Sequence, residues 1–385
     1  MNERTENIRY SALLGVHTML LCPAINFVTP YLAAAQVSNK DIGILVAVSC
    51  LLAVVLQQFF GRLVDRNIID GKKLLLFLTA ILTFAAFSLV FINVGSLSKA
   101  IIFGGLYCIT FVMMPVLYSF SFFYENKGVS VNYGVARGCG SMSFAVCSMI
   151  LGYLVAQFGT SLVPISCGIL GAVLFAILLT MPALKGTTSH AQTTATLKLS
   201  KFPAFRLMLI GLSLVMLFHN MLMTYFIYAI ENVGGDSSNM GIALAIAAAL
   251  EIPVLFLYTR IKGQTQSKIF LTASGIAFFL KAFLFVFAQS VTMIYLVQCL
   301  QIISYGLMAA ARVYYVDETV GKKYETTGQA YMSATETIGI VLGSVVGGFL
   351  MQGFGIDAVL WCGAIVSFAG MVCMIQSCRN KRTAL

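Results

Sequence analysis

Long apolar runs fill most of the chain, and short polar breaks separate them. An α-helix needs about 20 apolar residues to cross a bilayer, and the runs reach this length. Because the hydrocarbon core offers no water to backbone groups, each run must pair its own backbone as a helix. The pattern predicts an all-α integral membrane protein with twelve transmembrane helices at 9–35, 41–61, 73–95, 98–123, 134–157, 160–182, 204–231, 237–258, 268–288, 291–315, 328–352 and 356–377.

A Thr- and Ser-rich polar stretch follows the sixth run and divides the pattern into six plus six. We expect an N-terminal six-helix bundle at 1–183, a cytoplasmic linker at 184–203 and a C-terminal six-helix bundle at 204–385. The halves also repeat, since the residues around Ser38 and Ile44 before the second helix resemble those around Ser237 and Ile242 before the eighth. Short loops leave little room for chemistry, so we expect a site between the bundles, near the midplane.

Composition supports a membrane solvent, because 59% of residues are hydrophobic and only 10% are charged. The first run, which follows Arg9, is too long for a signal-peptide core and is interpreted as a retained helix. Ten cysteines are scattered through apolar runs without the spacing of a metal site. They are interpreted as packing residues, and no metal or cofactor is expected.

The net charge of +10 could suggest a nucleic-acid partner, but no basic domain with interleaved aromatic residues is present to bind one. With both termini in the cytoplasm, about 19 of the 24 Lys and Arg fall on cytoplasmic segments, and Lys40 and Lys99 fall outside. This asymmetry predicts a multi-pass protein of the cytoplasmic (inner) membrane, with membrane lipid as a partner of the basic loops.

The loop after the second helix runs from Gly61 through Asp65 and Arg66 to Gly71 and Lys72. It resembles the G-x-x-x-D-R-x-G-R-K signature of major facilitator transporters, apart from an insertion of a few residues before the second glycine. The resemblance implies a gating loop in which the aspartate pairs at a helix end and the basic residues bind neighbouring helix ends or anionic lipid. A generic positively charged cytoplasmic loop is the other interpretation.

The start of the fifth helix, from Asn132 to Phe144, reads N-Y-G-V-A-R-G-C-G-S-M-S-F. It resembles the Y-G-x-x-R-x-x-G-S-x-x-F block of the lactose permease and phenylpropionate permease branch, which contains oligosaccharide and nucleoside symporters driven by protons. Shorter matches span nearly the whole chain. The resemblance implies the major facilitator fold and a transporter rather than an enzyme.

The resemblance places a substrate-binding arginine at Arg137, where a planar guanidinium suits oxygen-rich or anionic ligands. A helix-locking pair with a carboxylate is the alternative. Phe144 stands where the lactose permease stacks a galactoside on tryptophan, so a galactoside is not favoured. Further substrate-binding candidates are Asn26, Tyr118, His219, Tyr225 and Gln301, although His219 is equally well explained as a packing residue.

Glu251, Lys281 and Glu336 are charged residues within apolar runs, where a charge needs a partner or a water-filled cavity. We expect them to couple transport to protons, with a permanent Glu251–Lys281 ion pair as the alternative. Relatives commonly carry a histidine where Gln301 stands and, in the lactose permease, a carboxylate where Ser304 stands. The coupling set of the lactose permease is therefore incomplete in this chain.

These features predict a proton symporter that moves a small polar solute by alternating access, with a sugar ahead of an aromatic acid or a nucleoside. An exporter or uniporter on the same fold remains open. A membrane enzyme or receptor is disfavoured, because no H-E-x-x-H motif, paired aspartates or sizeable soluble module is present. We expect a monomer.

Overall fold

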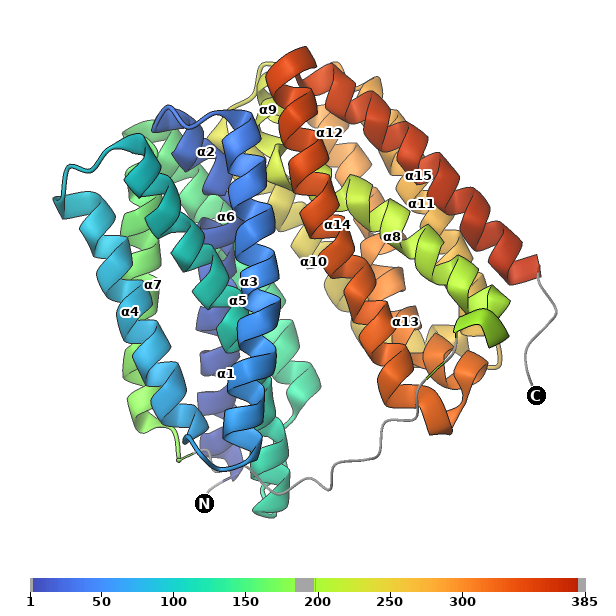
Figure 1. Cartoon of the computed structure of the whole chain (residues 1–385), viewed down its shortest axis with the longest axis horizontal. Helices are drawn as coiled ribbons and strands as arrows, with labels where there is room; N and C mark the ends of the chain where they lie inside the picture. Colours follow the sequence, from blue (N-terminus) through green and yellow to red (C-terminus); the bar gives the residue numbers. More distant parts are fainter. Residues whose placement is uncertain (1–2, 184–196, 198, 380–385) are drawn as a thin grey trace. The chain divides into compact units, whose positions relative to one another are not determined.

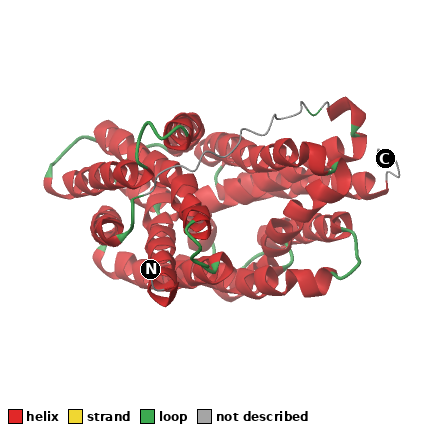
Figure 2. Ribbon diagram, turned by 90° about the horizontal axis from the view of Figure 1, so that it is seen from below, coloured by secondary structure: helices red, strands yellow, loops and turns green. Residues whose placement is uncertain are grey.

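The computed structural model describes residues 3–183, 197 and 199–379. Every regular element in these ranges is helical, and twelve of the helices are long and apolar enough to cross a membrane (Figures 1 and 2). The expected all-α fold with twelve spans is confirmed. Most of the expected linker, at 184–196 and 198, lies outside the described residues.

The chain divides into two compact units. Unit 1 comprises residues 1–190 and 236–245, and unit 2 comprises residues 191–235 and 246–385. The start of α10 falls in unit 1 because Gly241 lies directly against the backbone of Ser148 in α6, an approach that leaves no space for a Cβ. The expected division at 184–203 therefore stays a prediction.

Unit 1 is built from helices that meet in pairs, α1 with α6, α3 with α5 and α4 with α7. Polar caps fix where several begin: Ser38, Asp70 and Asn132 accept hydrogen bonds from the first turns of α3, α4 and α6. The elements are α1 (Glu3–Leu21), η1 (Cys22–Asn26), α2 (Val28–Ala34), α3 (Asn39–Asp65), α4 (Gly71–Phe91), α5 (Ser96–Asn126), α6 (Tyr133–Phe158) and α7 (Leu162–Thr180).

In unit 2, α8 packs on α14 and α15, and α11 packs on α15 and α13. Glycines allow the first of these contacts, since a Cβ on Gly343 would lie 2.6 Å from the Leu217 carbonyl oxygen. The elements are η2 (Leu199–Lys201), α8 (Pro203–Thr224), α9 (Phe226–Glu231), α10 (Ser237–Lys262), α11 (Ser267–Val286), α12 (Val291–Gln298), η3 (Cys299–Ile302), α13 (Tyr305–Val320), η4 (Lys322–Tyr324), α14 (Glu325–Phe354) and α15 (Ile356–Arg379).

Three of the expected spans are interrupted. The first changes to a π-helical turn at Cys22–Asn26, where Pro23 lacks the N–H of a regular helix. The seventh breaks between α8 and α9 at Tyr225, and the tenth passes through the 3₁₀ turn η3 before α13. Such breaks expose backbone groups inside an apolar bundle, and they lie beside several of the candidate site residues.

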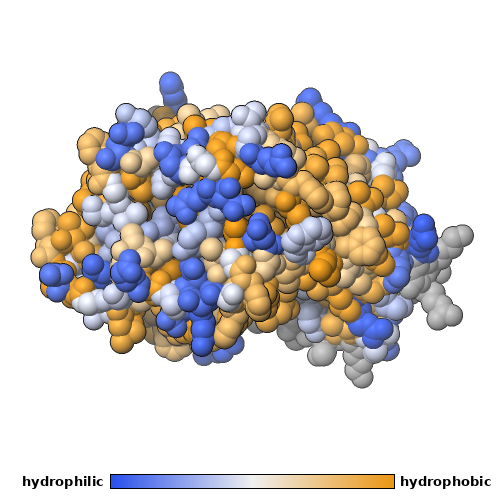
Figure 3. Space-filling model, turned by 90° about the horizontal axis from the view of Figure 1, so that it is seen from above, coloured by the Kyte–Doolittle hydropathy of each residue, from blue (hydrophilic) through white to orange (hydrophobic). Residues whose placement is uncertain are grey.

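The surface carries many large apolar side chains, such as Phe84 at 78% and Phe91 at 82% exposure. Apolar residues cover much of the face drawn in Figure 3, with hydrophilic residues gathered between them. In water this exposure would be costly, whereas lipid tails are a matching solvent.

Candidate functional site

Arg137 lies in the second turn of α6, and the Asn132 cap fixes the start of that helix through a 3.0 Å bond to the Val135 N–H. The Arg137 side chain is exposed, and its Nη1 donates to the Tyr118 hydroxyl at 3.3 Å. The Tyr118 ring meets Tyr133 edge to face, with centroids 5.9 Å apart. The structure thus places Arg137 and Tyr118, both expected from the sequence, side by side with an aromatic neighbour.

A cavity of about 270 Å³ lies in unit 1 between α1 and α6. Arg137 belongs to α6, one of the two helices that line it. Its wall combines hydroxyl and thiol groups with apolar side chains, from Ser11, Ala12, Gly15, Val16, Met19, Cys139 and Ser143. The sequence interpretation did not find these residues. The feature of the sequence that could have indicated this cavity is the pair Gly15 and Gly140, since these glycines let α1 and α6 approach closely.

Phe144 and Asn26 are half-buried in unit 1. The Phe144 carbonyl accepts from the Ser148 hydroxyl at 2.8 Å, and Asn26 ends the π-helical turn η1. Both remain candidates for contact with a solute.

Unit 2 holds a polar chain formed by the half-buried Glu251 of α10 and by the buried residues Gln301 of η3 and Lys281 of α11. The Lys281 ammonium donates to Gln301 Oε1 at 2.5 Å, and Gln301 Nε2 donates to Glu251 Oε1 at 2.9 Å. Lys281 is completely buried and Gln301 is 4% exposed. The amide of Gln301 therefore connects the two charged groups, an arrangement that the sequence interpretation did not foresee.

An amide can serve this purpose because it donates and accepts at once. In an apolar bundle each charge stabilises the other through Gln301, and neither could be removed without leaving its partner uncompensated. A proton gained or lost by Glu251 would change the net charge of the whole chain of groups.

A second polar group in unit 2 includes Glu336, which accepts from Arg312 at 2.9 Å and from the Tyr305 hydroxyl at 3.1 Å. The Tyr305 ring stacks on His219 with centroids 5.0 Å apart, and Phe278 meets the imidazole edge to face with centroids 5.9 Å apart. Glu336 is thus paired with a cation, and His219 lies in an aromatic stack.

Tyr225 is fully buried, and its hydroxyl donates to the Ser344 carbonyl at 3.0 Å. Its ring lies against the backbone of α14 at Gly347, which leaves it no exposed surface. Tyr225 therefore makes a helix contact at the α8–α9 break, and the substrate contact expected from the sequence stays a prediction.

Four buried polar side chains in unit 2 have atoms without a hydrogen-bond partner among the described residues, and Ser367 of α15 is one of them through its hydroxyl. The other three are Gln298 with both amide atoms, Ser304 with its hydroxyl and His219 with its Nδ1 atom. Buried polar atoms are normally paired, so these groups mark places where the bundle can bind water or another polar species.

The expected gating loop begins near the end of α3: Gly61 lies in the last turns of this helix, and Asp65 is the last residue of the helix. Asp65 and Arg66 are exposed, and Gly71 opens α4. Lys72 donates to the carbonyls of Leu179 at 3.0 Å and Met181 at 2.5 Å, at the end of α7. Asp70, within the insertion that departs from the family signature, is the N-cap of α4.

A model of the MFS_1 like family matches residues 16–360, so the chain belongs to this family of major facilitator transporters. It is 23% identical to the maltose permease of Geobacillus stearothermophilus over 359 residues, which cover 91% of this chain and 89% of that protein. Family membership makes it a multi-pass membrane transporter and not an enzyme.

Solved structures support the same fold. A point mutant of the nucleoside transporter NupG matches with a TM-score of 0.82 at 13% identity, covering 98% of this chain and 99% of the other. The POT family transporter PepTSo matches with a TM-score of 0.74 at 10% identity, covering 98% and 97%. At these identities the likeness concerns the fold alone.

Proposed function

We propose that the chain is a secondary active transporter that carries a small hydroxylated solute together with protons. The polar chain from the half-buried Glu251 through Gln301 to the buried Lys281 is the observation that carries this proposal. Charged groups inside a bundle of transmembrane helices are costly and mark transport sites or proton relays. Glu251 is the group that takes up and releases the proton, and Lys281 stabilises its charged form through Gln301.

The solute binds with the help of Arg137. A guanidinium holds its donors in one plane, which suits neighbouring hydroxyl groups or a carboxylate. The rings of Tyr118 and Tyr133 beside it suit the face of a sugar or a nucleobase. The similarity to a maltose permease supports a sugar ahead of a nucleoside or an aromatic acid.

The protein works by alternating access as a monomer in the cytoplasmic membrane, with both termini in the cytoplasm. The charge distribution along the chain supports this orientation, since most Lys and Arg fall on the same set of loops. The loop after α3 acts in gating through Lys72, which donates a hydrogen bond to the end of α7, and through the exposed Arg66.

The first test is solute-driven proton movement in liposomes that contain the purified protein. Maltose, uridine and an aromatic acid such as phenylpropionate are added in turn, and the external pH is followed for the wild type and Glu251→Gln. We expect alkalinisation with one solute in the wild type and none in the variant. Solute exchange across the liposome membrane is measured in parallel.

Each outcome separates one mechanism from another. Exchange without proton movement in either protein leaves a uniporter and removes the coupling role of Glu251. External acidification as the solute enters vesicles of known orientation means that solute and proton move in opposite directions, which is the coupling of an exporter. A variant that still alkalinises the medium shows that Glu251 is not the coupling group.

Arg137→Lys tests the binding role. Lysine keeps the charge but loses the planar fork, so we expect solute affinity to fall by about 10- to 100-fold, as the loss of one charged hydrogen bond predicts. Equilibrium binding of the solute identified above measures this change. Unchanged affinity would place Arg137 in helix contacts instead of solute binding.

A further inference from the structure

The first two turns of α1 hold the loop that joins α5 to α6, residues 127–132. The Asn7 side chain does this with both ends of its amide: Nδ2 donates to the Ser130 carbonyl at 2.8 Å, and Oδ1 accepts from the Asn132 N–H at 2.8 Å. The Glu3 carboxylate adds a 3.4 Å contact from the Ser130 N–H. One side chain thus pairs two backbone groups that lie more than 120 residues away in the chain.

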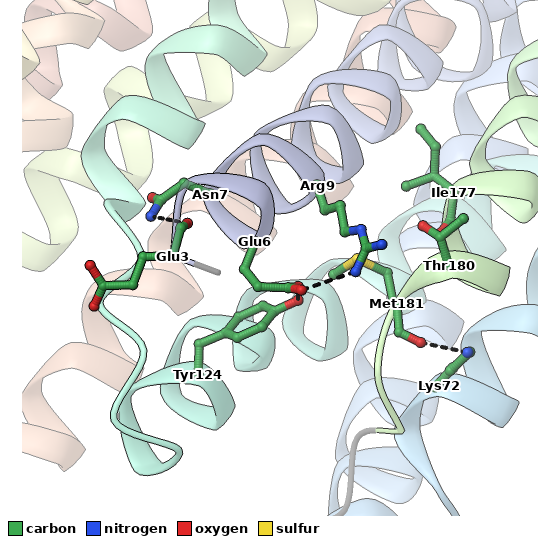
Figure 4. A network of polar contacts seen from close by, with 9 residues as sticks. All are labelled: Glu3, Glu6, Asn7, Arg9, Lys72, Tyr124, Ile177, Thr180 and Met181. Atoms are coloured by element: carbon green, nitrogen blue, oxygen red, sulfur yellow. Dashed lines mark hydrogen bonds and ion pairs between the residues drawn. The ribbon is translucent and has the colours of Figure 1, made fainter. Parts of the chain in front are cut away.

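A neighbouring carboxylate fixes the same turns of α1 to the end of α5. Glu6 is 4% exposed and accepts from the Tyr124 hydroxyl at 2.6 Å and from Arg9 at 2.9 Å. Figure 4 shows Glu6 between these two side chains, with Asn7 on the adjoining face of the helix. Because Glu6 is buried and charge-paired, the start of α1 is held firmly against α5.

The residue that Asn7 holds is the cap of α6. The Asn132 side chain accepts from the Val135 N–H, and the next residue, Tyr133, is the first of the helix. Tyr133 meets Tyr118, whose hydroxyl accepts from Arg137. Asn7 is therefore connected to the Arg137 guanidinium by its hydrogen bond to the Asn132 N–H, the Asn132 cap of α6, the Tyr133–Tyr118 ring contact and the Tyr118–Arg137 hydrogen bond.

We propose that Asn7 is a positioning residue for Arg137: its amide fixes the first turn of α6 and thereby the direction of the guanidinium. This inference rests on the proposed solute-binding role of Arg137. It assigns to the start of α1 a function beyond anchoring the first helix, namely setting solute affinity from outside the site.

The first measurement needs no solute. Cys139 is exposed on α6 two residues after Arg137, in the wall of the α1–α6 cavity, so its reaction rate with N-ethylmaleimide reports the position of this turn. The rate is read by peptide mass spectrometry for Asn7→Leu, Asn7→Asp and Asn93→Leu. Asn93 lies exposed in the α4–α5 loop and serves as the matched control.

We expect Asn7→Leu to change the Cys139 rate at least threefold and Asn93→Leu to leave it unchanged. Asn7→Asp keeps the acceptor for the Asn132 N–H and should give an intermediate Cys139 rate. If Asn7→Leu fails to fold, the Cys139 rate of Asn7→Asp serves as the test instead. An unchanged Cys139 rate in a folded Asn7→Leu protein overturns the proposal.

The second measurement is transport of maltose and uridine. Asn7→Leu should raise KM about 3- to 10-fold with Vmax within twofold, and this effect should disappear in an Arg137→Lys background, where the guanidinium geometry is already lost. An equal loss in both backgrounds would indicate a purely structural role and overturn the proposal. If the wild type transports neither probe, the proposed function fails on its own, and the Cys139 rate decides whether Asn7 positions α6.

Discussion

Two glutamines one turn apart in the tenth span have opposite surroundings. Gln301 uses both ends of its amide, toward Lys281 and Glu251. Gln298 is equally buried, yet neither of its amide atoms has a partner among the described residues. The family resemblance singled out Gln301 in the sequence, but only the fold shows that its amide lies between two charged groups.

We expect replacement of these glutamines by leucine to separate their roles. Gln301→Leu leaves the buried Lys281 and the half-buried Glu251 without their shared amide and should destabilise the protein by about 2–4 kcal/mol. Gln298→Leu removes an amide that is buried without a protein partner, so the change should be neutral or stabilising. Thermal unfolding in detergent measures both variants.

A loss of stability in Gln298→Leu as large as that in Gln301→Leu would contradict this prediction. It would show that the Gln298 amide binds an ordered water or another polar species in the native bundle.

At the scale of elements, the sequence could predict the number, approximate span and order of the transmembrane helices, because length and hydropathy determine them. It could not predict the breaks at η1, Tyr225 and η3, since those depend on contacts with neighbouring helices. The position of the Tyr225 ring beside Gly347 of α14 depends on the same kind of contact, and a solute contact of Tyr225 stays a prediction.

The contact between α8 and α14 depends on glycines. A methyl group on Gly343 would lie 2.6 Å from the Leu217 carbonyl and 2.8 Å from the Met221 nitrogen, both on the α8 backbone. Gly343→Ala should therefore force the helices apart and cost about 1–3 kcal/mol. Gly353→Ala, in the same helix but with nothing within 4 Å of the added carbon, should be neutral or gain up to about 1 kcal/mol.

Apparent melting temperatures of the two alanine variants in one detergent give a direct comparison. Equal melting temperatures would mean that α8 and α14 can separate without cost, contrary to the close approach seen in unit 2.

At the scale of the whole molecule, the resemblance of the loop after α3 and of the start of α6 to family signatures identified the transporter class that the family match shows. Arg137 and Tyr118, which the sequence analysis named as candidates, form a hydrogen bond in the structure, and their role in solute binding stays a prediction. The α1–α6 cavity, the role of Gln301 between two charges and the Asn7 contact were not found from the sequence, because each joins residues that are far apart in the chain.

The orientation proposed from charge can be tested with two engineered cysteines. Asn93 and Thr265 are exposed residues of loops that the charge asymmetry assigns to opposite sides of the membrane. A membrane-impermeant maleimide added to intact cells should label Asn93→Cys, while Thr265→Cys should react only after permeabilisation, with site-resolved mass spectrometry separating them from native thiols.

The opposite pattern would reverse the topology and place the Lys- and Arg-rich loops outside. Labelling of both sites in intact cells would contradict the assignment of these loops to opposite sides. Because the direction of proton-driven transport is defined relative to this orientation, the labelling result also fixes how proton movement in liposomes is assigned to uptake or export.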